Sequence, residues 1–436
     1  MRKRIIIMGA AGRDFHNFNT LFKNNRNYEV ICFTASQIPK IENRIYPKEL
    51  SGKLYENGIE IYPEKEIENI IKKLKINEVV LSYSDISNEE IMDRASLVNS
   101  IGADFRILSA ESTMLRSKRK IISICAVRTG CGKSQTTRKI AQILKKHKKR
   151  FVVVRHPMPY GNLKKQEVQR FENLKDLDRY SCTIEEREEY EHHIKNGTVV
   201  YAGVNYQKIL KQAEQEAEII LWDGGNNDTP FFKPDLHIVV CDGLRPNHEM
   251  RYYHGTLNLR LADVAIINKE NSSSKKDIII IEKNIKKINP RAKIIHADSL
   301  FGANKKVDLK DKKVLVIEDG PTLTHGGMEF GVGYLYSRWM NAKIIDGKKF
   351  AKGSIKKVYE KYPHIKLIVP AMGYFPEQIK EIEKIIKSAN PDFIVSGTPI
   401  DLNLVIKTKV PIIRIEYYLN EKNIKLEKIL KEIKII

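Results

Sequence analysis

The residues with the clearest chemical meaning form the segment V-R-T-G-C-G-K-S, which runs from Val127 to Ser134. It follows the apolar run IISICAV and precedes a helical pattern, so it has the strand, glycine-rich turn and helix order of a phosphate-binding loop. Gly130 and Gly132 allow the backbone to curl so that its N–H groups face phosphate oxygens, and the helix N-terminus adds partial positive charge. The sequence therefore predicts a nucleotide site, although Val127 stands where the usual pattern begins with Gly.

Each position of this loop has an expected role. Lys133 should reach the β- and γ-phosphates, and the Ser134 hydroxyl should hold Mg²⁺. Arg128 stands where one branch of phosphate-loop proteins has a second, signature lysine. It either stabilises transferred phosphoryl charge as a catalytic residue or is only structural. The predicted nucleotide-binding residues of the loop are Thr129, Gly130, Cys131, Gly132, Lys133, Ser134 and Gln135.

A second carboxylate must orient Mg²⁺ from the end of a neighbouring strand. In AEIILWDGGNND, Asp223 ends an apolar run and enters a glycine-rich turn, so we predict it as a metal ligand and catalytic residue. Asp228 is a weaker second candidate. The structural alternative is that Asp223 only caps the turn that follows its strand.

The segment ADVAIINKEN is similar to the N-K-x-D signature that reads guanine in GTPases, but Asn271 stands in place of the carboxylate. Guanine selectivity is therefore not established, and the nucleotide is ATP or GTP. Asn268 and Lys269 are the predicted residues of the base pocket.

Two Arg–His pairs follow predicted strands, at the place where open α/β sheets bind ligands. Arg155 ends FVVVR and His156 follows it, while Arg245 and His248 follow IVVCDG. We predict that both pairs bind a phosphorylated or carboxylated substrate, because Arg grips such groups in a bidentate manner. The alternative is that they are ordinary loop cations.

A strongly charged stretch, Gln166–Glu191, has two interpretations. It suggests a lid or switch over the substrate, and the adjacent His192 and His193 suggest a metal site. Because neighbours in sequence rarely bind one ion together, we favour a solvated helix.

Two glycine-rich regions carry weaker signals. The turn Gly9–Gly12 follows the strand RIIIM without the full GxGxxG spacing, so it is weak evidence for a second nucleotide site. The residues after it, Arg13, Asp14 and His16, serve either a ligand or the turn. In EDGPTLTHGGM we expect three pocket residues with no assigned role, which are Asp319, Thr324 and His325.

Short apolar runs alternate with Lys-rich amphipathic stretches from end to end, which is typical of the α/β class. Residues 1–115 predict an N-terminal, Rossmann-like, doubly wound domain, with strands at Arg4–Met8, Glu29–Phe33, Glu78–Leu81 and Phe105–Leu108. Residues 119–310 predict a phosphate-loop NTPase domain. Residues 311–436 form a C-terminal α/β segment that is either separate or part of the second sheet.

Composition limits the class of protein. The 436 residues, at roughly 150 per domain, indicate two or three domains. The net charge of +22 suits phosphorylated ligands, nucleic acid or an anionic membrane equally well. Five widely spaced cysteines without a CxxC pair, no signal-peptide pattern and no run of about 18 apolar residues indicate a soluble cytoplasmic protein that is not membrane-bound.

Several segments together resemble the predicted GTPases related to archaeal cyclic 2,3-diphosphoglycerate synthetase; they are GAAGRDFHNFNT, AVRTGCGKSQTT, ILWDGGNNDTPFFKPDLHIVV, CDGLRPNHE and SGTPIDL. The resemblance implies an N-terminal α/β domain joined to a SIMIBI-type phosphate-loop domain, and a homodimer. It also implies use of ATP and Mg²⁺ to close an intramolecular phosphoanhydride, with release of ADP and phosphate. GAAGRDFHNFNT departs from the start of the authentic synthetase, which leaves the substrate open.

The sequence thus predicts an Mg²⁺-dependent NTPase of the synthetase type that activates a small acid. The first alternative is a GTPase or ATPase switch that has no small-molecule product. A nucleic-acid-binding ATPase is disfavoured, because no aromatic–basic stacking motif accompanies the charge.

Overall fold

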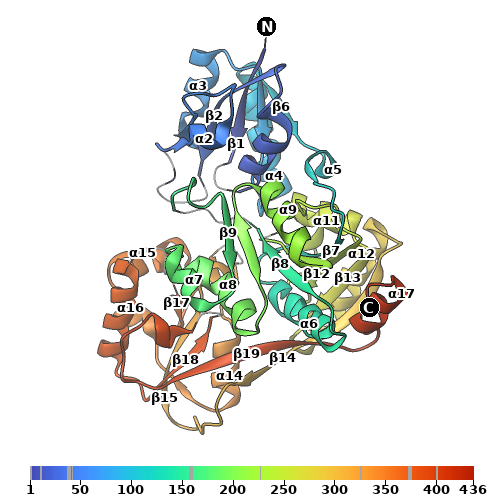
Figure 1. The fold of residues 1–436 in the computed structure, drawn as a ribbon. Helices are drawn as coiled ribbons and strands as arrows, with labels where there is room; N and C mark the ends of the chain where they lie inside the picture. Colours follow the sequence, from blue (N-terminus) through green and yellow to red (C-terminus); the bar gives the residue numbers. More distant parts are fainter. Residues whose placement is uncertain are drawn as a thin grey trace.

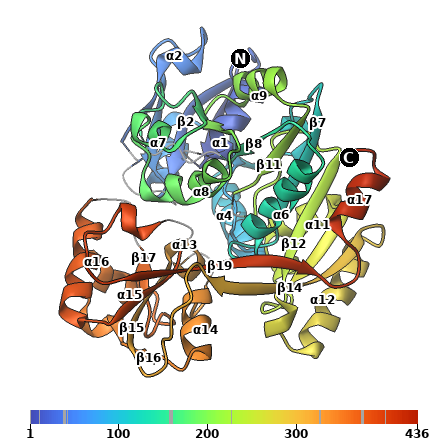
Figure 2. The same ribbon diagram turned by 60° about the horizontal axis from the view of Figure 1, so that its bottom comes forward.

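The computed structural model describes residues 2–9, 12–36, 41, 43–156, 161–225, 227–324, 327–371, 376–398 and 401–436, without the side chains of residues 184, 185, 321 and 376. His325, one of the expected pocket residues, lies outside the described residues. Figures 1 and 2 show three parts: an N-terminal unit in blue, a phosphate-loop unit in cyan to yellow, and a C-terminal unit in orange.

The N-terminal unit is built on a six-stranded sheet with the order β3-β4-β2-β1-β5-β6. Its strands are β1 (Lys3–Met8), β2 (Tyr28–Ala35), β3 (Ile45–Tyr46), β4 (Ile59–Pro63), β5 (Glu78–Leu81) and β6 (Asp104–Ile107). The described pairs are parallel apart from the short β3–β4 pair. The helical segments are α1 (Arg13–Asn17), η1 (Phe18–Phe22), α2 (Lys48–Ser51), η2 (Glu64–Glu66), α3 (Ile67–Leu74), α4 (Asn88–Ser100) and α5 (Ala110–Thr113).

Apolar side chains are buried on both faces of this sheet, one set around Phe15, Phe18 and Phe33 and the other around Ile67, Val79 and Val98. The predicted doubly wound α/β architecture is therefore confirmed. The prediction of a buried strand at Phe105–Leu108 is wrong, because β6 is an edge strand whose residues are half-buried or exposed.

The second sheet has thirteen strands, and the part from its middle to one edge belongs to the phosphate-loop unit, with the order β14-β13-β12-β7-β11-β8-β10-β9. These strands are β7 (Lys120–Ala126), β8 (Phe151–Arg155), β9 (Val168–Phe171), β10 (Val200–Gly203), β11 (Ile219–Asp223), β12 (Leu236–Asp242), β13 (Val264–Asn268) and β14 (Lys293–Ala303). The helices are α6 (Lys133–Lys146), α7 (Leu174–Arg179), α8 (Ile184–Lys195), α9 (Tyr206–Glu216), α10 (His248–Arg251), α11 (Tyr253–Leu261), η3 (Glu270–Ser272) and α12 (Lys275–Ile288).

The C-terminal unit continues the same sheet through a long antiparallel pair. In this pair β14 lies against β19 (Ile412–Glu421), with Ala297 opposite Glu421 and Ala303 opposite Ile415. The remaining strands are β15 (Lys313–Asp319), β16 (Lys343–Ile344), β17 (Val369–Ala371) and β18 (Phe393–Gly397). The helical segments are α13 (Gly320–Thr324), α14 (Val332–Trp339), η4 (Gly347–Phe350), α15 (Gly353–Lys361), α16 (Pro376–Ala389), η5 (Leu402–Leu404) and α17 (Leu426–Glu432).

The chain ends by returning to the phosphate-loop unit. Residues from Leu309 to Ile415 have an apolar cluster of their own. Leu419, Leu426 and Leu430, in contrast, are buried in the cluster that includes the core of β7 and α6. The domain boundaries at residues 115, 119 and 311 stay a prediction. A division of the chain into domains has to assign the last helix, α17, to the core of the phosphate-loop unit.

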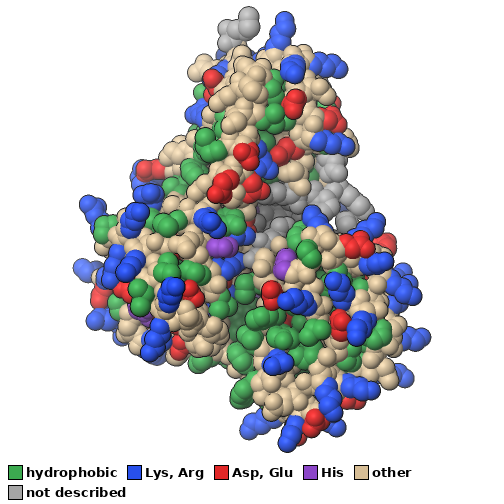
Figure 3. Space-filling view, turned by 180° about the vertical axis from the view of Figure 1, so that it is seen from behind, with side chains coloured by type: hydrophobic (Ala, Val, Ile, Leu, Met, Phe, Trp, Pro, Cys, Tyr) green, Lys and Arg blue, Asp and Glu red, His purple; other side chains and the backbone are tan. Residues whose placement is uncertain are grey.

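The side chains of Lys and Arg are spread over all three parts on the face shown in Figure 3. Within the described residues, no helix is long and apolar enough to cross a membrane.

Replacing Leu430 by Ala tests whether the packing of α17 stabilises the phosphate-loop unit. The side chain is fully buried, so its truncation should lower the free energy of unfolding of the phosphate-loop unit by about 2–5 kcal/mol. Urea unfolding followed by the fluorescence of buried Trp222 would measure it, with the exposed Lys431→Ala as control. Equal transitions for the two variants would show that the helix contributes little to this unit.

Candidate nucleotide site

The predicted phosphate loop joins β7 to α6, as the sequence indicates. Gly130 and Gly132 have φ values of +82° and +106°, a region that side chains with a Cβ rarely adopt. A Cβ at Gly132 would also collide with the amides of Asn268 and Gln135. Because Asn268 Nδ2 donates to the Cys131 carbonyl at 2.9 Å, the predicted base-pocket residue holds the loop itself in shape.

Lys133 and Asp223 lie together beneath this loop. Lys133 Nζ is 3.4 Å from Asp223 Oδ1, and the Thr137 hydroxyl, one turn later on α6, donates to the same oxygen at 3.2 Å. Asp223 ends the central strand β11 and is fully buried. Burial alone would raise its pKa, but Arg155 and Lys133 hold the pKa of this carboxyl well below its usual range, so it is ionised at neutral pH.

Arg155 is a partner of Asp223 in the described structure. Its Nη1 lies 3.3 Å from Asp223 Oδ1 and donates to the backbone carbonyl of Asp223 at 2.8 Å, while Nη2 pairs with Glu189. The side chain is 1% exposed. Arg155 therefore fixes the strand ends around the phosphate loop, and its prediction as a substrate residue stays untested.

The helix α8 brings His193 to the same carboxylate, with Nε2 3.2 Å from Asp223 Oδ2. The expectation of a solvated helix is wrong here, because Glu188, Glu191, His192 and His193 are all buried. His192, His193 and Asp223 could each offer a ligand atom within 4.8 Å of the others. His193 already hydrogen-bonds this carboxylate, which accounts for the closeness of the three side chains, so we derive no metal site from this group.

The residues predicted to bind Mg²⁺ offer suitable donor chemistry. Asp223 supplies an ionised carboxylate next to the phosphate-loop lysine, and Ser134 lies, half-buried, in the first turn of α6. Hard oxygen ligands of this kind are those that Mg²⁺ prefers.

Asp242, at the end of β12, is a further carboxylate beside the phosphate loop, and the sequence analysis did not predict it. Its Oδ2 binds Lys269 Nζ at 2.8 Å and Arg245 Nη2 at 2.8 Å, and Arg245 Nη2 also donates to the Thr129 carbonyl at 2.6 Å. Although burial opposes ionisation, the two cations lower the pKa of Asp242 to about 2. Asp242 thus positions Arg245 and Lys269 against the loop. Its position at the end of an apolar strand is the sequence feature that could have identified it.

The N-terminal unit also supplies a carboxylate to the phosphate loop. Asp85 follows β5, and its two oxygens accept hydrogen bonds from Arg128 Nε at 2.6 Å and from the Thr129 hydroxyl at 2.9 Å. The Arg128 guanidinium also lies 3.6 Å over the Tyr252 ring and donates to His248 Nδ1 at 3.2 Å. Burial, with Arg128 and Arg245 nearby, lowers the pKa of His248 to about 4, so this histidine is a neutral acceptor at pH 7.

The turn after β1 faces the loop after β11. Arg13 Nε pairs with Asp228 Oδ1, and His156 Nε2 lies 2.9 Å from Asp228 Oδ2. A Cβ on Gly12 would lie 3.8 Å from His156 Cε1. Asp228, the weaker metal candidate, therefore has both oxygens occupied, and it joins the predicted residues Arg13 and His156 across the two units.

The C-terminal unit closes the other side of the loop. A Cβ on Gly130 would contact Thr322 Cγ2 at 3.4 Å, and Thr322 is held by Asp319 through its backbone N–H at 3.1 Å and through its hydroxyl. Burial raises the pKa of Asp319 to about 6. Of the other predicted loop residues, Gln135 lies beside Gly132, and its Nε2 donates to the Ser299 hydroxyl on β14 at 3.1 Å.

Comparisons with known proteins place the chain in a family. It is 54% identical over 433 residues, 99% of this chain and 97% of its relative, to arginine synthetase ArcE of Thermococcus kodakarensis strain KOD1. The chain belongs to the cyclic 2,3-diphosphoglycerate synthetase-related family. The P-loop domain model of that synthetase matches residues 195–297, which contain Asp223, Asp242, Arg245, Asn268 and Lys269.

Two further similarities are more limited. The cyclic 2,3-diphosphoglycerate synthetase of Thermococcus sibiricus is 29% identical over 133 residues, 30% of each chain. The ATP complex of LpxK from Aquifex aeolicus covers 84% of this chain and 99% of its own at 13% identity, and its TM-score of 0.45 supports no further conclusion. Membership in the family makes this chain a synthetase-type ligase with a phosphate-loop fold that uses a nucleotide, as the sequence analysis predicted.

Replacing Asp85 by Asn tests whether the N-terminal unit positions Arg128. The variant weakens two hydrogen bonds that involve a buried charge, each worth about 1.5–3 kcal/mol, so kcat/KM for the nucleotide should fall roughly 10- to 100-fold. Steady-state release of nucleoside diphosphate measures it. Asp104→Asn, an exposed member of the same sheet, is the control.

A different result would assign Asp85 another role. Tighter nucleotide binding with an unchanged or faster turnover would show that Asp85 only blocks the loop.

Proposed function

We propose that this protein is an ATP- and Mg²⁺-dependent synthetase that forms arginine. The identity of 54% over nearly the whole chain to a protein named arginine synthetase supports this most strongly. A family relationship of that extent includes all three parts of the fold, and not only the nucleotide site.

The chemistry of arginine indicates which bond a phosphoryl donor would help to form. Citrulline carries an oxygen where arginine carries the last guanidino nitrogen. We infer that the ureido oxygen attacks the γ-phosphorus, so that an O–P bond forms and ADP leaves. Ammonia then attacks the activated carbon, the C–O bond breaks, and the phosphate leaves with the proton that the attacking nitrogen loses.

The geometry of the phosphate loop supports such a transfer. Lys133 and Arg128 are the cations that we assign to neutralise charge on the transferred group, and the positive φ values of Gly130 and Gly132 give the loop between them its tight curl. Asp223, ionised and buried, aligns Lys133 through its 3.4 Å ion pair. Asn268 and Lys269 support the loop from the side on which we place the base.

Mg²⁺, held by Ser134 and Asp223, would neutralise the β- and γ-phosphate oxygens. The preference for ATP over GTP is part of the proposal, since Asn271 gives no carboxylate for guanine.

Formation of cyclic 2,3-diphosphoglycerate is the second candidate. The matching P-loop domain model and the 29% identity over 133 residues favour it. It ranks lower because this similarity covers only 30% of the chain, against 99% for the arginine synthetase.

A product assay distinguishes these candidates. Purified protein with ATP and Mg²⁺ should convert citrulline and ammonium to arginine, with one ADP and one phosphate per arginine, measured by amino-acid chromatography and a coupled ADP assay. Lys133→Ala should lower kcat by about 10²-fold or more, since one preorganised cation at a transferred group has that order of effect. Removal of Mg²⁺ with a chelator should stop the reaction.

Parallel reactions with 2,3-diphosphoglycerate, and with GTP in place of ATP, complete the design. ADP release that depends on diphosphoglycerate and not on citrulline would replace arginine formation with the second candidate. Hydrolysis indifferent to both compounds would support a switch.

A further inference from the structure

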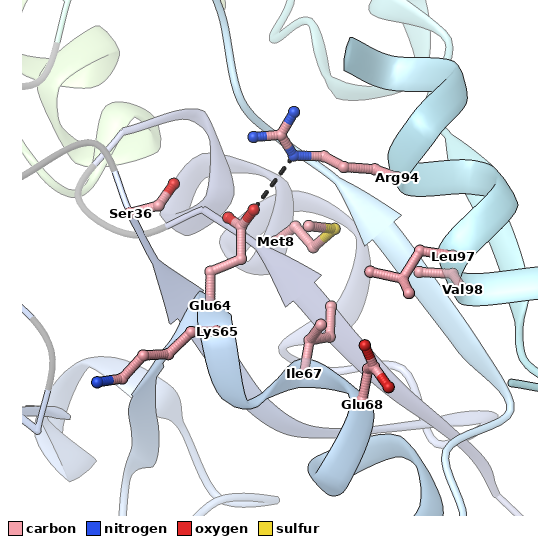
Figure 4. A pocket seen from close by; sticks show the side chains of 9 residues that line it. All are labelled: Met8, Ser36, Glu64, Lys65, Ile67, Glu68, Arg94, Leu97 and Val98. Carbon is pink, nitrogen blue, oxygen red and sulfur yellow. Dashed lines mark hydrogen bonds and ion pairs between the residues drawn. The ribbon is translucent and has the colours of Figure 1, made fainter.

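The N-terminal unit contains a cavity of about 410 Å³ at the carboxyl edge of its sheet (Figure 4). Met8 ends β1, Ser36 follows β2 and Glu64 follows β4, and these are three neighbouring strands. Open α/β sheets bind ligands outside the carboxyl ends of their strands. The full lining is Met8, Ser36, Glu64, Lys65, Ile67, Glu68, Arg94, Leu97 and Val98.

One wall of the cavity is apolar, and the charged residues of its lining carry equal numbers of positive and negative charges. Met8, Ile67 and Val98 are buried, while Leu97 is 38% exposed at the rim. The charged groups are two carboxylates and two cations, and in Figure 4 Arg94 points to Glu64 while Lys65 extends away from that pair. Arg94 Nε lies 3.2 Å from Glu64 Oε1.

Several buried polar groups lie beside this pair. Glu64, Ser36 and Thr34 are close enough to interact with the Tyr83 hydroxyl, although Glu64 Oε2, Thr34 Oγ1 and that hydroxyl make no hydrogen bond of ordinary geometry within the described part of the chain. Tyr83 is only 3% exposed and its ring lies 5.7 Å from the Arg94 guanidinium carbon. Buried polar groups normally make hydrogen bonds of good geometry, so a cluster whose bonds are imperfect offers atoms that a polar ligand would engage.

The cavity is also close to the phosphate loop along the chain. Tyr83 is two residues from Asp85, which bonds to Arg128 and Thr129. Two residues of extended chain span at most about 7 Å, so the Cα atoms of Tyr83 and Asp85 are no farther apart than that.

We propose that this cavity binds the α-amino and α-carboxylate groups of the amino-acid substrate. The carboxylate pairs with Arg94, the ammonium group pairs with Glu64, and the methylene stem lies on Met8, Ile67 and Val98. The choice of an amino acid rests on the proposed function. Two carboxylates in the lining disfavour a polyphosphate or diphosphoglycerate, and the four charges disfavour an apolar ligand.

Calorimetric titration of the full-length protein with L-arginine and with L-citrulline tests the site. The wild type should bind both, and Glu64→Gln and Arg94→Met should each weaken binding at least about tenfold, the effect of losing one charged hydrogen bond. Leu97→Trp, which fills the cavity from an exposed position, should do the same without loss of fold. The control is Arg106→Met, which removes a similar ion pair with Glu78, the first residue of β5, at the opposite edge of the sheet.

Steady-state kinetics separate this site from the proposed function. In the three cavity variants KM for citrulline should rise at least about tenfold while KM for ATP stays unchanged. The site would be overturned if the wild type bound neither amino acid. It would also be overturned if the cavity variants had the same binding and KM values as the wild type. If the wild type binds L-arginine in this cavity but forms none from ATP, the site stands and the proposed function fails.

Discussion

The buried carboxylate of Asp223 is the group on which the arrangement of the phosphate-loop unit depends. An ionised carboxylate without partners costs several kcal/mol in a protein interior, so it must be surrounded by cations and donors. Lys133 and Thr137 come from α6, Arg155 from β8 and His193 from α8. One charge therefore holds a helix, a strand and a second helix at the place where phosphate has to bind. Loss of the carboxylate would leave the buried Arg155 with Glu189 and backbone carbonyls as its partners among the described residues.

The phosphate loop is held from both sides by carboxylates of other elements. Asp242 fixes Arg245, which grips the loop backbone at Thr129, and Asp85 fixes Arg128 and the Thr129 hydroxyl. Donors that are already oriented cost no reorganisation when charge develops on a transferred group. The same bonds give the N-terminal unit a direct influence on the loop, because Asp85 follows a strand of the first sheet and Arg128 belongs to the second.

The elements that local sequence determines could be predicted, and the long-range partners could not. The order of β7, glycine-rich loop and α6 depends on neighbours in sequence, so the place of the loop and the strand-end position of Asp223 could be predicted. Asp85 lies far from Arg128 in sequence, and nothing in either segment specifies their pairing. The segment EEREEYEHH has the composition of a solvated helix. It is buried because Glu189 and His193 meet Arg155 and Asp223, and because the Thr398 hydroxyl donates to Glu188 at 2.7 Å.

The convergence of three units on one loop has a chemical consequence. In the proposed reaction the phosphorylated ureido group is an activated species, and water would hydrolyse it in competition with ammonia. The N-terminal unit meets the loop through Asp85, the C-terminal unit through Thr322, and α8 lies against Asp223 from the third direction. A phosphate loop alone would suffice for NTP hydrolysis, whereas synthesis needs the reacting atoms kept from solvent. The long β14–β19 pair, which carries the C-terminal unit back to the loop, is therefore best understood as part of the synthetase machinery and not as an appendage.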